Sequence, residues 1–98
     1  MQVEPAISTD TQAPVAILGC GLIGISWSAL FLHHGIDVHA WDPNPDARNW
    51  LADRIKPSMA QLLQMGPPAR ALGHLSVFSE MPEALDGVSF AQENAPEV

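Results

Sequence analysis

Short apolar runs separated by turn-forming residues predict that strands and helices alternate along this chain. Residues 15–18 form a continuous apolar run, which is typical of a strand covered on both faces in a parallel sheet. Residues 36–41 alternate between apolar and polar positions and precede the turn-forming sequence PNP. Two further strands are predicted over residues 75–79 and 88–92. The pattern therefore predicts four strands.

Helical spacing follows the first strand. Apolar side chains recur three and four residues apart, which predicts a helix over about 22–34. We expect one face of this helix to lie on the sheet, and its members are Ile23, Trp27, Leu30 and Phe31. Gly35 is expected to end the helix in a left-handed conformation.

The remaining intervals complete a regular order of elements. A second helical pattern covers about 46–64 and is expected to kink or split at Pro57. A helical turn is predicted over 82–85. Right-handed connections between these elements predict an α/β fold of the Rossmann type, its first β-α-β-α-β-α-β half, with strand order 3-2-1-4. We expect residues 14–98 to form this domain and residues 1–13 to be a flexible tail.

Three glycines between the first strand and the first helix have the spacing G-x-G-x-x-G, which is typical of a loop around a pyrophosphate. Gly19 would allow the tight turn, Gly21 would leave room for the pyrophosphate, and Gly24 would let the helix approach the strand. The phosphates would bind the backbone amides of Leu22 and Ile23, where the helix dipole favours negative charge.

Asp42 stands eighteen residues after Gly24, at the end of the second predicted strand. An acid at this place accepts hydrogen bonds from the adenosine ribose hydroxyls of a dinucleotide. The residues that follow, PNPD, contain no Arg to receive a 2'-phosphate, so NAD should be preferred over NADP. The alternative is that Asp42 is only a turn-forming acid before Pro43.

Composition and charge limit the function further. Four Lys and Arg against eleven Asp and Glu give a net charge of −7, which repels nucleic acid and anionic lipids. Residues 15–32 carry no charge and are long enough for a membrane span. The glycines within this run and the lack of flanking basic residues favour a buried strand, turn and helix instead. We therefore expect neither nucleic acid nor a membrane as a partner.

A single cysteine and four histidines are the other reactive side chains. One cysteine cannot form an internal disulfide, so a reducing cytoplasm is the expected compartment. Cys20 lies near a helix N-terminus that could lower its pKa, although a small packing residue is the favoured interpretation. His33 and His34 would suit the end of the first helix, and we predict no metal site.

Two stretches of this chain resemble one known family. Residues 15–42, VAILGCGLIGISWSALFLHHGIDVHAWD, resemble the N-terminus of the 3-hydroxyacyl-CoA dehydrogenase superfamily, and residues 90–97, FAQENAPE, resemble the family's fourth strand and the motif after it. The sequence GLIGISW is most similar to the branch that contains L-carnitine dehydrogenase and lambda-crystallin (L-gulonate 3-dehydrogenase). The resemblance implies that NAD is the cofactor.

The resemblance also implies roles near the end of the chain. Glu97 matches the family's acid that reaches the nicotinamide-side ribose, and the backbone around Asn94 and Ala95 would line the same edge of the cofactor. Without the resemblance, Glu97 would be interpreted as a solvated terminal acid.

The family's catalytic residues have no counterpart in this sequence. These enzymes use a His paired with a Glu, helped by Ser and Asn, and those motifs follow the fourth strand. We therefore assign no catalytic residue. Two functions stay open, namely the NAD-binding domain of a dehydrogenase for L-carnitine, L-gulonate or 3-hydroxyacyl-CoA that is inactive alone, and a free-standing dinucleotide-binding module. The unpaired edge of the fourth strand also suggests a homo-oligomer.

Overall fold

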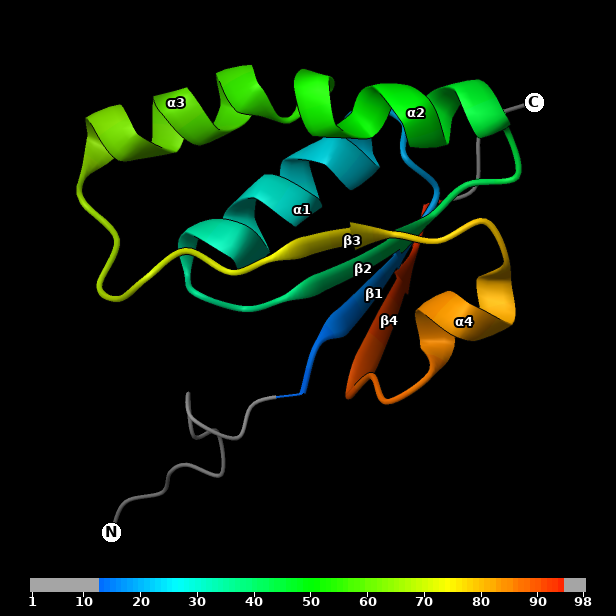
Figure 1. Ribbon diagram of the computed structural model, residues 1–98. Helices are drawn as coiled ribbons and strands as arrows, with labels where there is room; N and C mark the ends of the chain where they lie inside the picture. Colours follow the sequence, from blue (N-terminus) through cyan, green and yellow to red (C-terminus); the bar gives the residue numbers. More distant parts are fainter. Residues whose placement is uncertain (1–12, 95–98) are drawn as a thin grey trace, which may run out of the picture.

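A single parallel sheet with helices on both faces forms the core of this protein. The computed structural model describes residues 13–94, and its strands have the order β3-β2-β1-β4, as predicted. The strands are β1 (Val15–Leu18), β2 (Val38–Trp41), β3 (Leu75–Val77) and β4 (Phe90–Glu93). The helices are α1 (Leu22–His33), α2 (Pro45–Arg54), α3 (Lys56–Met65) and α4 (Met81–Leu85). Helices α1, α2 and α3 lie on one face of the sheet and α4 on the other (Figure 1).

The register of the strands brings together the segments that follow β1, β2 and β4. Leu18 at the end of β1 lies opposite Trp41 of β2 on one side and Glu93 of β4 on the other. Because parallel strands end at the same edge of a sheet, the residues that follow them are neighbours. This edge holds the glycine loop, Asp42 and Asn94.

The uncharged run 15–32 is divided between a strand, a turn and a helix of 12 residues. Its strand β1 is the most buried of the sheet, and it pairs with both β2 and β4. Within residues 13–94, no helix has the length and apolar character that a membrane crossing requires.

The face that α1 turns to the sheet differs from the predicted one. Ile23, Trp27 and Leu30 are exposed, and only Phe31 of the predicted face packs against the core. The buried residues of the helix are Gly24, Ile25, Ser28, Ala29 and Leu32. Gly24 lets the helix backbone approach β1 closely, and the bulky side chains that join the core are Ile25 and Leu32 rather than Ile23, Trp27 and Leu30.

The second helical pattern is two helices rather than one. Helix α2 ends at Arg54, Ile55 lies between the helices, and α3 begins at Lys56. Pro57 lies in the first turn of α3, where a backbone N–H has no acceptor within the helix, so proline removes no helical hydrogen bond there. Gly35 has a φ of +80°, which confirms the left-handed end of α1.

The core lies between the sheet and the helices on its α1 face. Its most buried large side chains include Ile17 of β1, Val38 of β2 and Leu51 of α2. Met59 and Leu62 of α3 pack against this cluster from outside. The buried face of α2 therefore anchors the helix that follows Asp42.

Candidate functional site

A cavity of about 530 Å³ opens at the carboxyl ends of β1, β2 and β4. Crevices at this edge are where open α/β sheets bind their ligands. Its lining residues come from the glycine loop, the strand ends, α2 and α4, and they are Leu18, Gly19, Cys20, Gly21, Trp41, Asp42, Pro43, Asn44, Ala47, Trp50, Arg54, Met81, Glu93 and Asn94. The predicted phosphate loop and the predicted ribose acid thus share one cavity.

Two of the three glycines are required by the fold itself. Gly19 has a φ of +104°, and a side chain there would overlap the backbone of Asn94. A side chain at Gly24 would overlap the carbonyl of Gly19 and contact Ile17. These contacts confirm a tight turn at Gly19 and close packing of helix against strand at Gly24.

Gly21 is not required by the fold. Its φ is −79° and its ψ is −162°, an extended conformation open to any residue, and a Cβ atom there would meet nothing within 4 Å. Since Gly21 lines the cavity, the space beside it is open to a ligand. This space fits the pyrophosphate of a dinucleotide, for which a side chain would be an obstacle.

The N-terminus of α1 supplies unpaired donors at this loop. The first backbone hydrogen bond of the helix runs from Ile25 N to Gly21 O at 2.8 Å. The N–H groups of Leu22 and Ile23 therefore have no acceptor within the helix, as is general for the first turn of a helix. Such donors, at the positive end of the helix dipole, are suited to phosphate.

The Asp42 carboxylate is held firmly at the mouth of the loop. Its Oδ2 accepts a hydrogen bond from the N–H of Cys20 at 2.7 Å, and its Oδ1 accepts one from the N–H of Asn44 at 2.8 Å. Each carboxylate oxygen retains a further lone pair that can accept from a ribose hydroxyl. The bond to Asn44 also shows that Asp42 shapes the turn, so the two interpretations of this residue are compatible.

Cys20 is a buried residue of the loop and not a reactive thiol. Burial raises its pKa from 9.0 to about 12, the negative charge of Asp42 adds to this effect, and Arg48 opposes it. Its Sγ lies 3.7 Å from the carbonyl oxygen of Trp41. Burial of Cys20 agrees with the interpretation as a packing residue, and its pKa is raised, chiefly by desolvation, rather than lowered.

Several lining residues were not predicted from the sequence. Trp50 and Arg54 of α2 line the cavity, with the Arg54 guanidinium 4.6 Å from the centre of the Trp50 ring. Met81 belongs to α4 and Glu93 ends β4. Among these residues, only Glu93 could have been found from the sequence, because it lies at the end of a predicted strand. Which helical residues line the cavity depends on how the helices pack.

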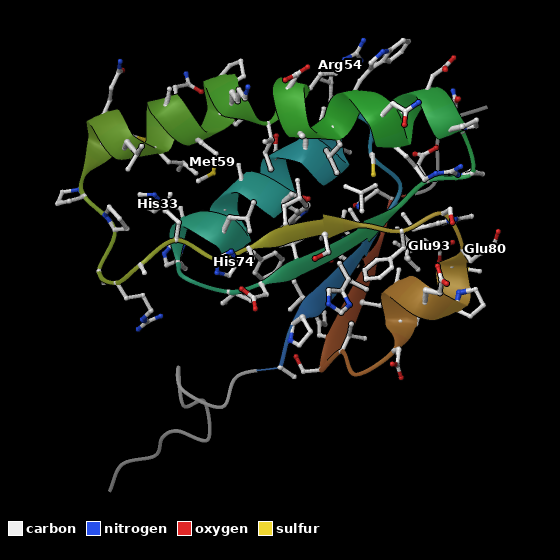
Figure 2. The ribbon with its side chains drawn as sticks, in the orientation of Figure 1. His33, Arg54, Met59, His74, Glu80 and Glu93 are labelled. Atoms are coloured by element: carbon white, nitrogen blue, oxygen red, sulfur yellow. The ribbon has the colours of Figure 1, made fainter. Side chains whose placement is uncertain are left out.

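Asn94 lies beside Gly19, and its N–H donates to the carbonyl of Leu18 at 2.7 Å. The structure thus places Asn94 in the cavity, whereas Ala95 and Glu97 lie outside the described residues and keep their roles as predictions. His33 and His74 lie at the opposite end of the sheet from Glu93 (Figure 2). Within residues 13–94, no histidine lines the cavity.

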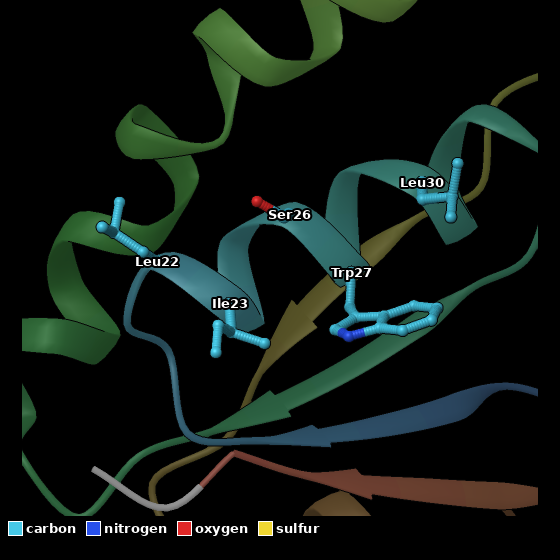
Figure 3. Close-up of a pocket in the computed structure, with 5 residues that line it drawn as sticks. All are labelled: Leu22, Ile23, Ser26, Trp27 and Leu30. Atoms are coloured by element: carbon cyan, nitrogen blue, oxygen red, sulfur yellow. The ribbon is translucent and has the colours of Figure 1, made fainter. Parts of the chain in front are cut away.

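A second, apolar groove of about 290 Å³ lies on the outer face of α1 (Figure 3). Its lining residues are Leu22, Ile23, Ser26, Trp27 and Leu30, and none carries a charge. It begins at the N-terminus of α1, next to the cavity, but the only polar side-chain groups of its lining are the Ser26 hydroxyl and the Trp27 indole N–H. The larger cavity, which holds the glycine loop and Asp42, is therefore the better candidate for a dinucleotide.

Comparison with known proteins agrees with this site. Residues 14–98 match the 3-hydroxyacyl-CoA dehydrogenase, NAD binding domain. An L-carnitine dehydrogenase of Pseudomonas sp. is 43% identical over 83 residues, covering 84% of this chain and 26% of the enzyme. The L-carnitine dehydrogenase of Streptomyces griseus is 43% identical over 84 residues, covering 85% of this chain and 25% of the enzyme. The chain thus spans about a quarter of the length of these relatives.

A solved structure shows the same fold. The crystal structure of an NAD-dependent dismutase, 5-formyl-3-hydroxy-2-methylpyridine 4-carboxylic acid 5-dehydrogenase, superposes with a TM-score of 0.74 at 23% identity. The match covers 90% of this chain and 29% of that protein. At this identity the likeness shows the Rossmann-type fold alone.

Proposed function

Because the chain belongs to the 3-hydroxyacyl-CoA dehydrogenase family, whose NAD-binding domain it matches over residues 14–98, we propose that it is the cofactor-binding part of a dehydrogenase for a secondary alcohol. L-carnitine is the first candidate substrate, since relatives that are 43% identical are L-carnitine dehydrogenases. L-gulonate and 3-hydroxyacyl-CoA are the other candidates that the family resemblance offers. NAD is the cofactor, and it supplies the hydride acceptor.

The observation that carries this proposal is the open space at Gly21. Of the three glycines, Gly21 alone has neither a left-handed backbone nor a close neighbour that excludes a side chain. Because Gly21 also lines the cavity beside the N-terminus of α1, a bound pyrophosphate would account for the missing side chain. Asp42 lines the same cavity, where its carboxylate can accept the ribose hydroxyls.

The role of each group follows from its chemistry. The first-turn amides of α1 would bind the pyrophosphate, the Asp42 carboxylate would orient the adenosine, and Asn94 would line the edge toward the nicotinamide. Oxidation of an alcohol also needs a base for the hydroxyl proton. Because no histidine of the described residues lines the cavity, we propose that the chain binds NAD but needs further polypeptide for catalysis.

Replacing Gly21 by Val tests the cofactor site. The branched side chain would occupy the space where the pyrophosphate passes, so we expect the affinity for NAD to fall at least about a hundredfold, while circular dichroism stays that of the parent. Isothermal titration calorimetry measures the affinity. We also expect weak NAD binding by the unmodified chain, with little affinity for NADP.

Gly66→Val is the matched control for this variant. Gly66 ends α3, its backbone is extended, and a Cβ atom there would also meet nothing within 4 Å. It lies outside the cavity lining, so Gly66→Val should bind NAD as the parent does. Equal NAD affinity of Gly21→Val and the parent would contradict the proposed site.

Formation of NADH with each of the three candidate substrates tests the need for further polypeptide. We expect none above the control without protein, because binding alone does not move the hydroxyl proton. Turnover of any one substrate by this chain without an added partner would show that its own residues complete the active site.

A further inference from the structure

Helix α1 exposes an uncharged face in a chain of net charge −7. Of the four helices within residues 13–94, α1 is the only one without an Asp, Glu, Lys or Arg. Its outer side chains are apolar and open to solvent, with Leu22 85% and Ile23 64% exposed. A contiguous apolar patch that is exposed in this way marks an interaction surface.

The shape of this face is a ridge with a hollow on each side. Leu22, Ser26 and Leu30 are four residues apart and form the ridge, and Ile23 and Trp27 lie along the other side of the groove (Figure 3). A second hollow of about 220 Å³ shares Ser26 and Leu30 and lies between α1 and α3. No described lining residue of either hollow is charged. The other lining residues of the second hollow are Ala29, Ser58, Gln61, Leu62 and Met65.

We propose that the outer face of α1 is an interface between two copies of this chain, in which the ridge of each copy packs into the groove of the other. Rows of side chains four residues apart interdigitate in this way in the commonest class of helix–helix contact. The occupant of the groove is therefore α1 of a second copy, since its own ridge has the matching spacing. This inference does not depend on the proposed function, because it rests on a different surface of the molecule.

Charge favours a second copy over an unrelated partner. A contact between two identical surfaces brings each side chain near its own counterpart, so a charged residue at the centre of the contact would meet a like charge. The outer face of α1 has no such residue. A basic partner would instead gain from acidic side chains at its docking surface, and α1 offers none although the chain has eleven Asp and Glu.

Ser26 lies at the centre of the proposed interface. It is the middle residue of the ridge, and a two-fold axis through the contact passes where the two ridges cross. Its side chain is small and exposed, so the two helices can approach closely at this position. Trp27 and Leu30 beside it are 39% and 38% exposed, and the contact would bury their apolar surface.

The proposed interface leaves the cofactor cavity open. None of the five residues that line the groove lines the cavity. The pyrophosphate would bind the backbone N–H groups of Leu22 and Ile23, whereas the interface uses their side chains. We therefore expect dimerisation and the binding of NAD to be independent of each other.

Opposite charges at Ser26 test this arrangement. Ser26→Lys and Ser26→Glu remove no apolar side chain, but each places two like charges at the centre of the contact, so we expect each to weaken dimerisation at least about tenfold. An equimolar mixture of the two variants pairs a lysine with a glutamate, and we expect it to associate at least about tenfold more tightly than either variant alone. Sedimentation equilibrium of the 98-residue chain over a range of concentrations measures the association, and circular dichroism checks the fold of each variant.

Gln64→Lys and Gln64→Glu are the matched controls. Gln64 is an exposed, uncharged residue of α3 that lines neither hollow. These variants carry the same changes in charge, so they should dimerise as the parent does. Leu30→Lys and Leu30→Glu repeat the test at the end of the ridge if the Ser26 variants are poorly folded.

The outcomes decide for or against a second copy as the occupant. A parent that dimerises, single Ser26 variants that dissociate and a mixture that associates again support the inference. A parent that stays monomeric at about 100 μM, a mixture no tighter than its components, or equal weakening by the Gln64 variants refutes it. Titration of the parent with NAD tests the proposed function separately, since neither result depends on the other.

Discussion

At the scale of single residues, the G-x-G-x-x-G motif contains two kinds of glycine. Gly19 and Gly24 are needed by the folded chain, since side chains there would overlap neighbouring backbone. Gly21 has no such neighbour. Substitutions in this one loop should therefore separate effects on stability from effects on binding.

Cys20 gives a prediction about pH. Burial, and secondly Asp42, raise its pKa to about 12 from 9.0 in the unfolded chain. Between these values the unfolded chain has released the thiol proton while the folded chain keeps it. The contribution of the thiol to stability is thus complete below pH 9 and is lost as the pH rises toward 12.

Urea unfolding of the parent and of Cys20→Ala, at about pH 8 and about pH 10.5, measures this contribution. The parent should lose more stability than the variant on going to high pH, because lysine and other groups titrate in both and cancel in the difference. An equal loss in the two proteins would mean that the thiol ionises normally in the folded state.

At the scale of elements, α1 shows how small residues decide packing. The helix buries Gly24, Ser28 and Ala29, with Gly24 against β1, and its outer face carries Trp27 and Leu30. Close approach of two backbones gains many weak contacts along the helix, and it is possible only where side chains are small. The position of α1, and with it the phosphate loop, depends on this face.

Gly24→Ala should therefore lower the free energy of unfolding by about 1–3 kcal/mol, because the added methyl group forces α1 away from β1. Gly21→Ala is the control within the same loop, and it should change stability by less than about 1 kcal/mol, because the lower entropy of the unfolded chain offsets the weaker helix N-cap. Urea denaturation of both variants measures the difference. Similar destabilisation by the two substitutions would contradict the packing role of Gly24.

The elements differ in how far the sequence predicts them. The strands and their order follow from local apolar runs and right-handed connections, and β1 has the predicted bounds. The buried face of α1 does not follow from the sequence pattern, because the helical spacing of its bulky apolar residues is clearer than that of the small residues that pack. The hydrogen bond from Arg48 to the carbonyl of Asp42 could not be predicted either, because it joins a residue of α2 to one six positions earlier in the chain.

The sequence predicted two parts of the cavity, the glycine loop and Asp42, and the structure adds the walls around them. Glycine spacing and a strand-end acid locate the loop and Asp42, since both depend on local chain geometry. The walls from α2 and α4 depend on where those helices pack against the sheet, and no local pattern shows that Trp50 or Met81 lines the same cavity. The tertiary arrangement has to be known first.

At the scale of the whole molecule, residues 13–94 leave an apolar surface on one side exposed. The apolar groove of α1 continues through aromatic rings: Trp27 stacks on Phe31 with ring centres 5.8 Å apart, and Phe31 meets Phe90 edge to face at 6.2 Å. Phe90 begins β4, which pairs only with β1 and so leaves its other edge open. The chain carries a charge of −7, so two copies repel each other except where a surface is uncharged.

We therefore expect the isolated chain to self-associate through the outer face of α1 and the edge of β4. Leu30→Lys places a charge in the groove and should weaken association at least about tenfold. Leu63→Lys is the control, since Leu63 is a helical leucine of similar exposure, 45% against 38%. Light scattering over a range of concentrations measures the mass; equal weakening by both variants would exclude this face as the contact.

The open space at Gly21 also has a consequence for descent. A lineage that had stopped binding a dinucleotide would keep Gly19 and Gly24, because the chain must still fold, while mutation could replace Gly21 freely. A domain that no longer binds a dinucleotide and one that still does would then differ first at position 21, while their folds stayed the same. Of the three glycines of the loop, Gly21 is therefore the one at which a loss of dinucleotide binding would first become visible.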